Sequence, residues 1–325
     1  MASPIRFGRF LLVDRVAVGG MAEVFAAVRP GDPPDRAYAV KRMLPTLAED
    51  EDLVRMFLDE ARLQVQLDHP SIVPVHDLGR IEARYYMVMD YVAGRDLRAL
   101  VDRARAEGER LPIPLAAHLA WHVADALDHV HRRKDAKGAE LRIVHRDVSP
   151  ANVLVGFDGV ARIIDFGVAQ AAFRRGSRPG VLRGKFGYMS PEMVRGLPVD
   201  RRSDVFALGV VLHEALTGER LFTGPSELAV MERVRAADVR PPSASNPSVP
   251  RELDAVVLRA LAREPEDRIA WASDLRDALL PFTCGAPPDD PSIVARAMAR
   301  AFPEELRGEM QRRRRLREAA EEAAP

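Results

Sequence analysis

The stretch that decides the fold is residues 143–152, Ile143-Val144-His145-Arg146-Asp147-Val148-Ser149-Pro150-Ala151-Asn152. A second short sequence, Asp165-Phe166-Gly167, begins thirteen residues after Asn152, and a turn at Asp158-Gly159 separates two apolar runs between them. Asp-Phe-Gly alone carries little information, because any three-residue string recurs by chance. The ordered combination of His-Arg-Asp, an asparagine five residues after the aspartate, two short strands and Asp-Phe-Gly is a strong signal.

Composition limits the class of protein before any other motif is considered. The chain has 325 residues, 47% hydrophobic and 30% charged, which is enough apolar material for a folded core. Lys+Arg and Asp+Glu both number 48, and this balance disfavours a nucleic-acid binder because such proteins usually carry excess positive charge. The single cysteine, Cys284, excludes an internal disulfide framework. We expect no signal peptide and no membrane span, since the longest apolar run, residues 205–216, contains His213 and Glu214, and we expect a cytoplasmic location.

The chain divides into a strand-rich part and a helical part, which predicts an α+β fold. The first 92 residues contain short β-rich runs separated by Gly, Pro and Asp, with one helix predicted over residues 49–67. Glu60 lies on the apolar stripe of that helix, so it requires a nearby cation. Later apolar periodicity predicts helices over residues 115–132, 203–217, 225–237, 251–263 and 271–280, of which the second is nearly apolar all round and therefore central.

These motifs resemble the catalytic core of protein kinases, specifically the eukaryotic-like serine/threonine kinases of bacteria. The resemblance covers nearly everything from Phe10 to about Leu280. It implies a bilobal fold with a small β-rich N-lobe containing one helix and a larger helical C-lobe. The corresponding boundaries are a kinase domain over residues 1–281, with the N-lobe at about 1–91, the hinge at 90–96 and the C-lobe at about 97–281.

The remaining residues, 282–325, are predicted to form a helical tail of unknown role. Its basic run, residues 312–315, is followed by Glu318, Glu321 and Glu322, so the charges offset one another. A solvated helix is therefore favoured over a nucleic-acid patch.

The resemblance assigns roles in phosphoryl transfer to five residues. Lys41 is expected to hold the α/β phosphates of ATP, with Glu60 as its partner, and Asp147 to accept the proton of the substrate hydroxyl. Asn152 and Asp165 are the expected metal ligands, which implies ATP with Mg²⁺, or alternatively Mn²⁺. The expected nucleotide-binding residues, besides Lys41 and Glu60, are Ala17, Val18, Gly19, Gly20, Val24, Ala39, Asp90, Val92, Asp96 and Leu154.

Other family landmarks concern the architecture. Ser190-Pro191-Glu192 stands where the family has Ala-Pro-Glu, and Arg268 resembles its buried ion-pair partner. Asp204, at the start of the central helix, is expected to accept hydrogen bonds from the catalytic-loop backbone.

Several positions depart from the family pattern. Residues 17–24 keep only Gly19 of the three motif glycines, so side chains stand where the backbone approaches phosphate.

Ser149 stands where serine/threonine kinases usually have lysine, and Lys185 stands where the family usually has threonine. The two look like one reciprocal exchange, which predicts Lys185 as a further catalytic residue that reaches the transferring phosphate; alternatively, Lys185 faces solvent. Outside the Ser-Pro-Glu motif, the only hydroxyl of residues 165–192 that a serine/threonine kinase could modify is Ser177, so loop phosphorylation is either confined to Ser177 or dispensable.

Three functions remain open from the sequence. The leading one is an ATP-dependent protein-serine/threonine kinase that transfers the γ-phosphate to protein hydroxyl groups in bacterial signalling. The alternatives are a pseudokinase acting as a nucleotide-dependent binding or scaffold module, and a small-molecule phosphotransferase of similar fold. Tyrosine specificity is disfavoured because residues 148–152 keep the proline of the serine/threonine pattern. The expected partners are protein substrates and no nucleic acid; a homodimer is one arrangement that would allow autophosphorylation.

Overall fold

The computed structural model describes residues 3–135, 137–166, 186–283 and 290–323. The chain separates into two compact units. Unit 1 comprises Met1–Asp68, Val73–Gly94 and Phe302–Pro325, and unit 2 comprises His69–Ile72 and Arg95–Ala301. The predicted β-rich lobe therefore corresponds to unit 1, and the predicted helical lobe to unit 2.

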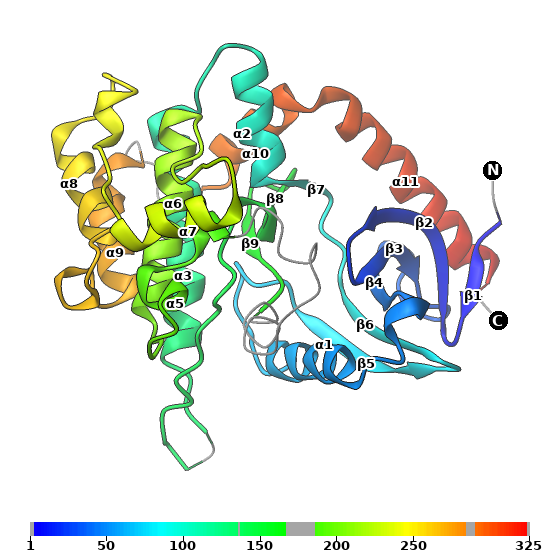
Figure 1. Ribbon diagram of the computed structural model, residues 1–325. Helices are drawn as coiled ribbons and strands as arrows, with labels where there is room; N and C mark the ends of the chain where they lie inside the picture. Colours follow the sequence, from blue (N-terminus) through cyan, green and yellow to red (C-terminus); the bar gives the residue numbers. More distant parts are fainter. Residues whose placement is uncertain (1–2, 136, 167–185, 284–289, 324–325) are drawn as a thin grey trace. The chain divides into compact units, whose positions relative to one another are not determined.

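Unit 1 is built on a six-stranded antiparallel sheet with the strand order β1-β2-β3-β4-β6-β5 (Figure 1). The strands are β1 (Ile5–Phe7), β2 (Phe10–Val18), β3 (Ala22–Val28), β4 (Tyr38–Met43), β5 (Val75–Ile81) and β6 (Arg84–Asp90), and the unit also contains the helices α1 (Glu51–Gln64) and α11 (Pro303–Glu322). Alternate residues of the strands form an aromatic-rich core that includes Phe10, Phe25 and Val40. The register pairs Lys41 of β4 with Val24 of β3 and with Met87 of β6, which places Lys41 on the central strands.

The helix predicted over residues 49–67 is α1. Its N-cap, Asp50, accepts hydrogen bonds from the backbone N–H groups of Asp52 and Leu53, and two acidic residues occupy its first turn, where the helix dipole favours them. The helix buries Phe57 and, on the same face, Glu60. The apolar stripe seen in the sequence thus faces the interior of unit 1.

The last helix of the chain, α11, belongs to unit 1. It packs on β2 and β3, where Leu316, Ala319 and Ala320 are buried with Ala26 and Val28 (Figure 1). The predicted helix is confirmed, but the prediction that it is solvated is wrong for this face. The apolar stripe consists mainly of one leucine and two alanines, and the strongly charged residues around it conceal it in the sequence.

Unit 2 is mainly helical. Its helices are α2 (Leu97–Ala106), α3 (Ile113–His131), α5 (Pro191–Val194), α6 (Arg202–Thr217), α7 (Glu227–Ala236), α8 (Arg251–Ala260), α9 (Ala272–Leu279) and α10 (Ser292–Ala301). Every residue of α6 from Ser203 to Thr217 is buried, which confirms the prediction of a central helix. The other helices predicted in the second part of the chain correspond to α3, α7, α8 and α9. None of the helices in the described ranges is long and apolar enough to span a bilayer.

A small sheet connects the two deciding motifs. It has the order β7-β8-β9, with β7 (Gly94–Asp96), β8 (Val153–Gly156) and β9 (Ala161–Ile163). The β8–β9 hairpin turns at Gly159, whose φ of +86° and close approach to the backbone of Pro291 exclude a side chain. Because the Ile164 N–H donates to the Asn152 carbonyl, at 3.0 Å, the hairpin returns the chain beside the catalytic loop.

Candidate active site

The residues of unit 1 that are expected to bind nucleotide include a buried ion pair. Lys41 Nζ lies 3.0 Å from Glu60 Oε1, and the two side chains are 14% and 3% exposed. The ammonium also lies 5.9 Å from the centroid of the Phe57 ring, within the range of a cation–π contact. The prediction that Glu60 requires a nearby cation is confirmed.

The β2–β3 hairpin carries the residues of the expected phosphate loop. Ala17 and Val18 are strand residues paired with Val24 and Glu23, and the turn closes with a 2.8 Å bond from the Gly19 N–H to the Ala22 carbonyl. A Cβ added at Gly20 would meet no atom within 4 Å, and one at Gly19 would lie 3.6 Å from its nearest neighbour. Packing against the residues that the structure describes therefore does not require either glycine. A bound group that approaches this backbone closely would be a physical reason for small residues here.

Three of the expected nucleotide-binding residues occupy ordinary strand positions. Val24 and Ala39 lie on neighbouring strands, β3 and β4, and Ala39 is buried. Leu154 lies on β8 in unit 2 and is partly exposed.

Two of the predicted hinge residues have structural partners that the sequence did not reveal. The Asp90 carboxylate accepts a 2.8 Å hydrogen bond from Arg36 and lies 2.7 Å from His76 Nε2. The backbone N–H of Asp90 donates to the Pro74 carbonyl. Asp96 is the N-cap of α2, and its side chain accepts a 2.8 Å bond from the Ala99 N–H. Val92, another expected nucleotide-binding residue, is half-buried.

In unit 2, Asp204 holds the catalytic loop. Its Oδ2 accepts a 2.7 Å bond from the His145 N–H and lies 2.8 Å from His131 Nε2, and its Oδ1 accepts a 2.8 Å bond from the Arg146 N–H. Burial alone would raise the pKa of Asp204, but the contact with His131 and these hydrogen bonds hold the pKa below its ordinary value. The predicted role of Asp204 is confirmed.

His145 links the catalytic loop to the Asp165 segment. Its Nδ1 accepts a bond from the Asp147 N–H and its Nε2 lies 3.2 Å from the Ile164 carbonyl, while the ring centroid is 4.4 Å from that of Phe166. Burial lowers the pKa of His145, so the ring is neutral and its Nε2–H donates to that carbonyl. The His-Arg-Asp segment and the segment from Ile164 to Phe166 thus hold each other in position.

The predicted base and metal ligands occupy one corner of unit 2. The amide nitrogen of Asn152 donates to both the carbonyl and the Oδ2 of Asp147, each at 2.8 Å. This commits the nitrogen and leaves Oδ1 as the atom of Asn152 that can bind a cation. Asp165 has a φ of +61° and Arg146 a φ of +66°, left-handed conformations that cost energy in residues with a side chain and are typical of functional sites.

The expected donor set fits a hard divalent metal ion. Within the described ranges no cluster of three or more His, Cys, Asp or Glu side chains could hold a metal ion on its own. The amide oxygen of Asn152 and the carboxylate of Asp165 are hard donors, and Mg²⁺ is usually held by one or two protein carboxylates together with phosphate oxygens and water.

Of the two residues in the predicted exchange, Ser149 and Lys185, the structure describes only Ser149. Ser149 is 3% exposed, and its Oγ has no hydrogen-bond partner among the residues that the structure describes. Lys185 and Ser177 lie outside those residues.

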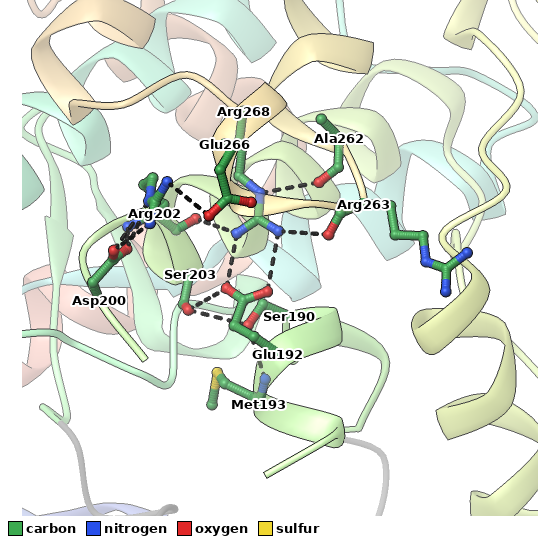
Figure 2. Close-up of polar contacts among 10 residues, drawn as sticks. All are labelled: Ser190, Glu192, Met193, Asp200, Arg202, Ser203, Ala262, Arg263, Glu266 and Arg268. Atoms are coloured by element: carbon green, nitrogen blue, oxygen red, sulfur yellow. Dashed lines mark hydrogen bonds and ion pairs between the residues drawn. The ribbon is translucent and has the colours of Figure 1, made fainter. Parts of the chain in front are cut away.

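The architectural ion pair is fully formed. Arg268 binds Glu192 through two bonds, at 2.8 and 3.1 Å, and donates further bonds to three backbone carbonyls (Figure 2). The hydroxyl of Ser203 also donates to Glu192. The prediction that Arg268 is the buried partner of Glu192 is confirmed.

A further buried carboxylate in unit 2, Glu214, was missed. The Tyr188 hydroxyl donates to Glu214 Oε2 at 2.8 Å, and Arg98 lies 3.3 Å from the same oxygen. Burial raises the pKa of Glu214, and Arg98 offsets this only in part. The signal that revealed Glu60, an acidic residue within an apolar helix, was also present at Glu214.

The two units together contain the elements of the protein-kinase fold. A model of the protein kinase domain matches residues 12–279, so the chain belongs to the protein kinase family. Members of this family use ATP and a divalent metal ion. The PknI kinase domain of Mycobacterium tuberculosis has a similar crystal structure, with a TM-score of 0.65 and 29% identity over 87% of this chain and 99% of that one.

Two curated relatives carry different specificities in their names. The tyrosine-protein kinase MasK of Myxococcus xanthus (strain DK1622) is 42% identical over 278 residues, which cover 85% of this chain and 43% of MasK. The serine/threonine-protein kinase PknB of Mycobacterium tuberculosis (strain H37Rv) is 37% identical over 298 residues, which cover 89% of this chain and 45% of PknB. The chain thus spans less than half the length of these relatives.

Proposed function

We propose that this chain is the catalytic part of an ATP-dependent protein kinase that transfers the γ-phosphate of ATP to serine and threonine hydroxyls of protein substrates, in bacterial signalling. The observation that carries the proposal is the geometry around Asp147, whose carboxylate is bonded to Asn152 on a loop that Asp204 holds. Such a group suits proton abstraction beside a metal ion. We propose a cytoplasmic location, because the reaction requires ATP.

Each residue has a distinct role in this proposal. Lys41 binds the α/β phosphates and is oriented by Glu60, and Asp147 accepts the proton of the attacking hydroxyl. Asn152 Oδ1 and Asp165 hold Mg²⁺, for which Mn²⁺ is a substitute. A metal ion held there would supply positive charge that offsets the negative charge developing during the transfer.

The pseudokinase alternative is disfavoured by the completeness of this set. Lys41 is already paired with Glu60, and Asn152 already with Asp147, and a binding module would require neither pair in this form. The small-molecule phosphotransferase is disfavoured by the family to which the chain belongs.

A radiolabelled-ATP assay with a protein substrate tests the proposal. Wild-type protein should transfer phosphate, and the Asp147→Asn variant should lose nearly all transfer while MgATP still raises its melting temperature. A wild-type protein that is stabilised by MgATP but transfers nothing would be a pseudokinase. No stabilisation at millimolar MgATP would contradict nucleotide binding altogether.

Tyrosine phosphorylation is the second candidate, because the name of MasK supports it and the name of PknB supports serine and threonine. We favour serine and threonine because Pro150 keeps the serine/threonine pattern of the catalytic loop. Three peptides that differ only in a central Ser, Thr or Tyr separate the two. A kcat/KM at least ten times higher for Tyr would reverse the assignment.

We also propose that Lys185 replaces the missing catalytic-loop lysine. Ser149 Oγ, buried and without a partner among the described residues, supports a cation near this position. Lys185→Ala should lower kcat by roughly ten- to a thousandfold and leave the KM for ATP nearly unchanged. Ser149→Lys with Lys185→Thr should recover part of the loss. Undiminished turnover of Lys185→Ala would rule the exchange out.

Autophosphorylation between copies gives a further readout of the activity. Wild-type protein mixed with a tagged Asp147→Asn copy should label the inactive copy if one copy phosphorylates another. Mass spectrometry should find loop phosphate only at Ser177, and Ser177→Ala should retain most activity. A Ser177→Ala variant that loses most activity would show that this phosphorylation is required.

A further inference from the structure

The helix α11, near the C-terminus, completes unit 1. The chain leaves unit 1 after Gly94 and returns to it at Phe302. On its return, α11 covers the paired strands β2 and β3, and Leu316, Ala319 and Ala320 are at most 6% exposed. Partly buried side chains of β2 and of the following segments, including Leu11, Val13 and Ala37, complete this apolar contact.

A polar network fixes the position of α11 along the strands. Asp14 of β2 accepts bonds from Arg312, at 3.1 Å, and from Arg315. Asp14 and Arg312 are only 25% and 23% exposed, so solvent screens this pair less than a surface pair. The register pairs Asp14 with Ala26, which itself packs against α11.

The same network reaches Tyr91. The Tyr91 hydroxyl donates to Glu309 at 2.7 Å and accepts a bond from Arg312 at 2.8 Å, and Glu309 pairs with Arg312. Burial raises the pKa of Tyr91, so its hydroxyl remains protonated and can donate. Arg312 therefore links α11 to both β2 and Tyr91.

These attachment points coincide with the unit 1 segments assigned to the nucleotide. Strand β2 ends at Val18 in the phosphate loop, β3 carries Val24, and Tyr91 lies between Asp90 and Val92. A helix that fixes all three segments restricts the conformations of the loop and of the adenine-binding backbone. Restricting a site in its binding conformation raises affinity, because less ordering remains to be done on binding.

We propose that α11 is an intramolecular effector of the nucleotide site. In this proposal Tyr91 is the positioning residue through which the docking of α11 raises the affinity for nucleotide. Docking of α11 and binding of nucleotide stabilise each other, since coupling between two binding events is reciprocal. This inference rests on the proposed function only for the presence of nucleotide. The docking itself can be measured without it.

Four variants of the full chain test the coupling. Leu316→Asp places a charge in the apolar contact, and Leu316→Met is the conservative control for it. Tyr91→Phe removes only the hydroxyl that bonds Glu309. Its matched control is Tyr86→Phe, which removes a tyrosine hydroxyl that donates to a different carboxylate, Asp77, in the same sheet.

Docking is measured by amide hydrogen exchange of residues 303–322, and affinity by calorimetric titration with MgADP. Leu316→Asp should speed exchange and raise the Kd for MgADP by about five- to twentyfold, a typical range for allosteric coupling. Tyr91→Phe should raise the Kd and the KM for ATP by about two- to fivefold with kcat unchanged. Leu316→Met and Tyr86→Phe should match the wild type, and MgADP should slow exchange of residues 303–322 in the wild type.

The proposal fails if Leu316→Asp speeds exchange but leaves the Kd unchanged or lowers it. It also fails if exchange in residues 303–322 is unchanged in Leu316→Asp, because the helix is then not held by this face. An equal effect of Tyr86→Phe and Tyr91→Phe would overturn the role of Tyr91. A wild-type protein that binds no MgADP while residues 303–322 are protected would contradict the proposed function and the coupling, and leave only the docking.

Discussion

Each unit contains a buried carboxylate paired with a cation, and the two pairs are built differently. In unit 1, Lys41 meets Glu60 through one 3.0 Å contact, and the lysine side chain retains 14% exposure. In unit 2, Arg268 is fully buried, binds both oxygens of Glu192 and donates to three carbonyls (Figure 2). The guanidinium fork has a partner in every direction, while the lysine is a compact charge on a flexible stem.

The difference separates a fixed contact from an adjustable one. Burial alone would raise the pKa of Glu192, but the bonds from Arg268 hold it below the ordinary value, so the carboxylate stays ionised within its network. A bidentate pair of this kind fixes geometry and leaves no capacity for a ligand. A lysine ammonium has three donors, so Lys41 can engage Glu60 and still bind a phosphate. The Glu192–Arg268 pair therefore suits an architectural role, and the Lys41–Glu60 pair suits a chemical one.

The largest expected effect follows from breaking the fixed pair. Arg268→Met should lower the free energy of unfolding by about 3–5 kcal/mol, because it leaves Glu192 buried without a cation. Urea denaturation measures the change. Arg62→Met, which breaks the exposed pair with Asp59, is the matched control and should cost less than about 1 kcal/mol. Arg268→Met with Glu192→Met should recover part of the loss; a single-variant loss no greater than that of the control would contradict the comparison.

Breaking the adjustable pair should mainly affect catalysis. Lys41→Met should lower kcat at least about a hundredfold, equivalent to about 2.7 kcal/mol in the barrier. We expect a smaller loss of stability than for Arg268→Met, since the lysine side chain is flexible and 14% exposed, whereas Arg268 is fully buried. Urea denaturation and the phosphate-transfer assay on the same preparations separate the two effects. A Lys41→Met variant that is as unstable as Arg268→Met would make both pairs structural.

The same contrast explains how much the sequence could predict. The Glu192–Arg268 pair and the anchoring by Asp204 belong to ordered motifs, and the cation beside Glu60 follows from the cost of a buried charge. The docking of α11 could not be predicted in this way. The partner of Arg312 and Arg315 is Asp14, about 300 residues earlier in the chain, and no local pattern connects them.

The partners of the predicted hinge residues illustrate the same limit. Asp96 was expected at the nucleotide and caps α2, and both roles use the same residue type at the same position. Neighbours in sequence determine a cap, but distant segments determine which backbone groups of the hinge remain for a ligand. The roles of Asp96, Val92 and Lys185 in binding and transfer therefore stay predictions.

Acid unfolding sharpens the comparison within unit 2, because Glu192 and Glu214 have pKa shifts of opposite sign. A lowered folded-state pKa stabilises above the unfolded value, near 4.5, and this contribution is lost as the pH falls through the folded value. The raised pKa of Glu214 has the opposite effect: its contribution to stability is present below the unfolded value and is lost as the pH rises through the folded value. The stability deficit of Glu192→Gln should therefore shrink as the pH falls below 4.5, while Glu214→Gln should gain on the wild type as the pH rises above it. Denaturant titrations from pH 3 to pH 8 measure both trends, and parallel trends would contradict the assigned partners.

The smallest effect is expected where a carboxylate with two basic partners is partly exposed. Asp125 lies 3.1 Å from His69 Nε2 and 2.8 Å from an Arg276 nitrogen, and its side chain is 28% exposed. The contact with His69, and then that with Arg276, lowers the pKa of Asp125 to about 2. Asp125→Asn should cost about 0.5–1 kcal/mol at pH 7, because water already solvates part of the charge.

Salt distinguishes this exposed cluster from the buried pair. Raising NaCl from about 0.05 to 0.5 M shortens the electrostatic screening length about threefold. The stability deficit of Asp125→Asn should therefore fall by about half or more. The deficit of Arg268→Met should change little, since its partner is 5% exposed and ions cannot approach it. The Asp125 contribution is present above the unfolded pKa, near 3.8, and is lost as the pH falls through about 2. If salt reduced both deficits equally, burial would not be what separates the two kinds of contact.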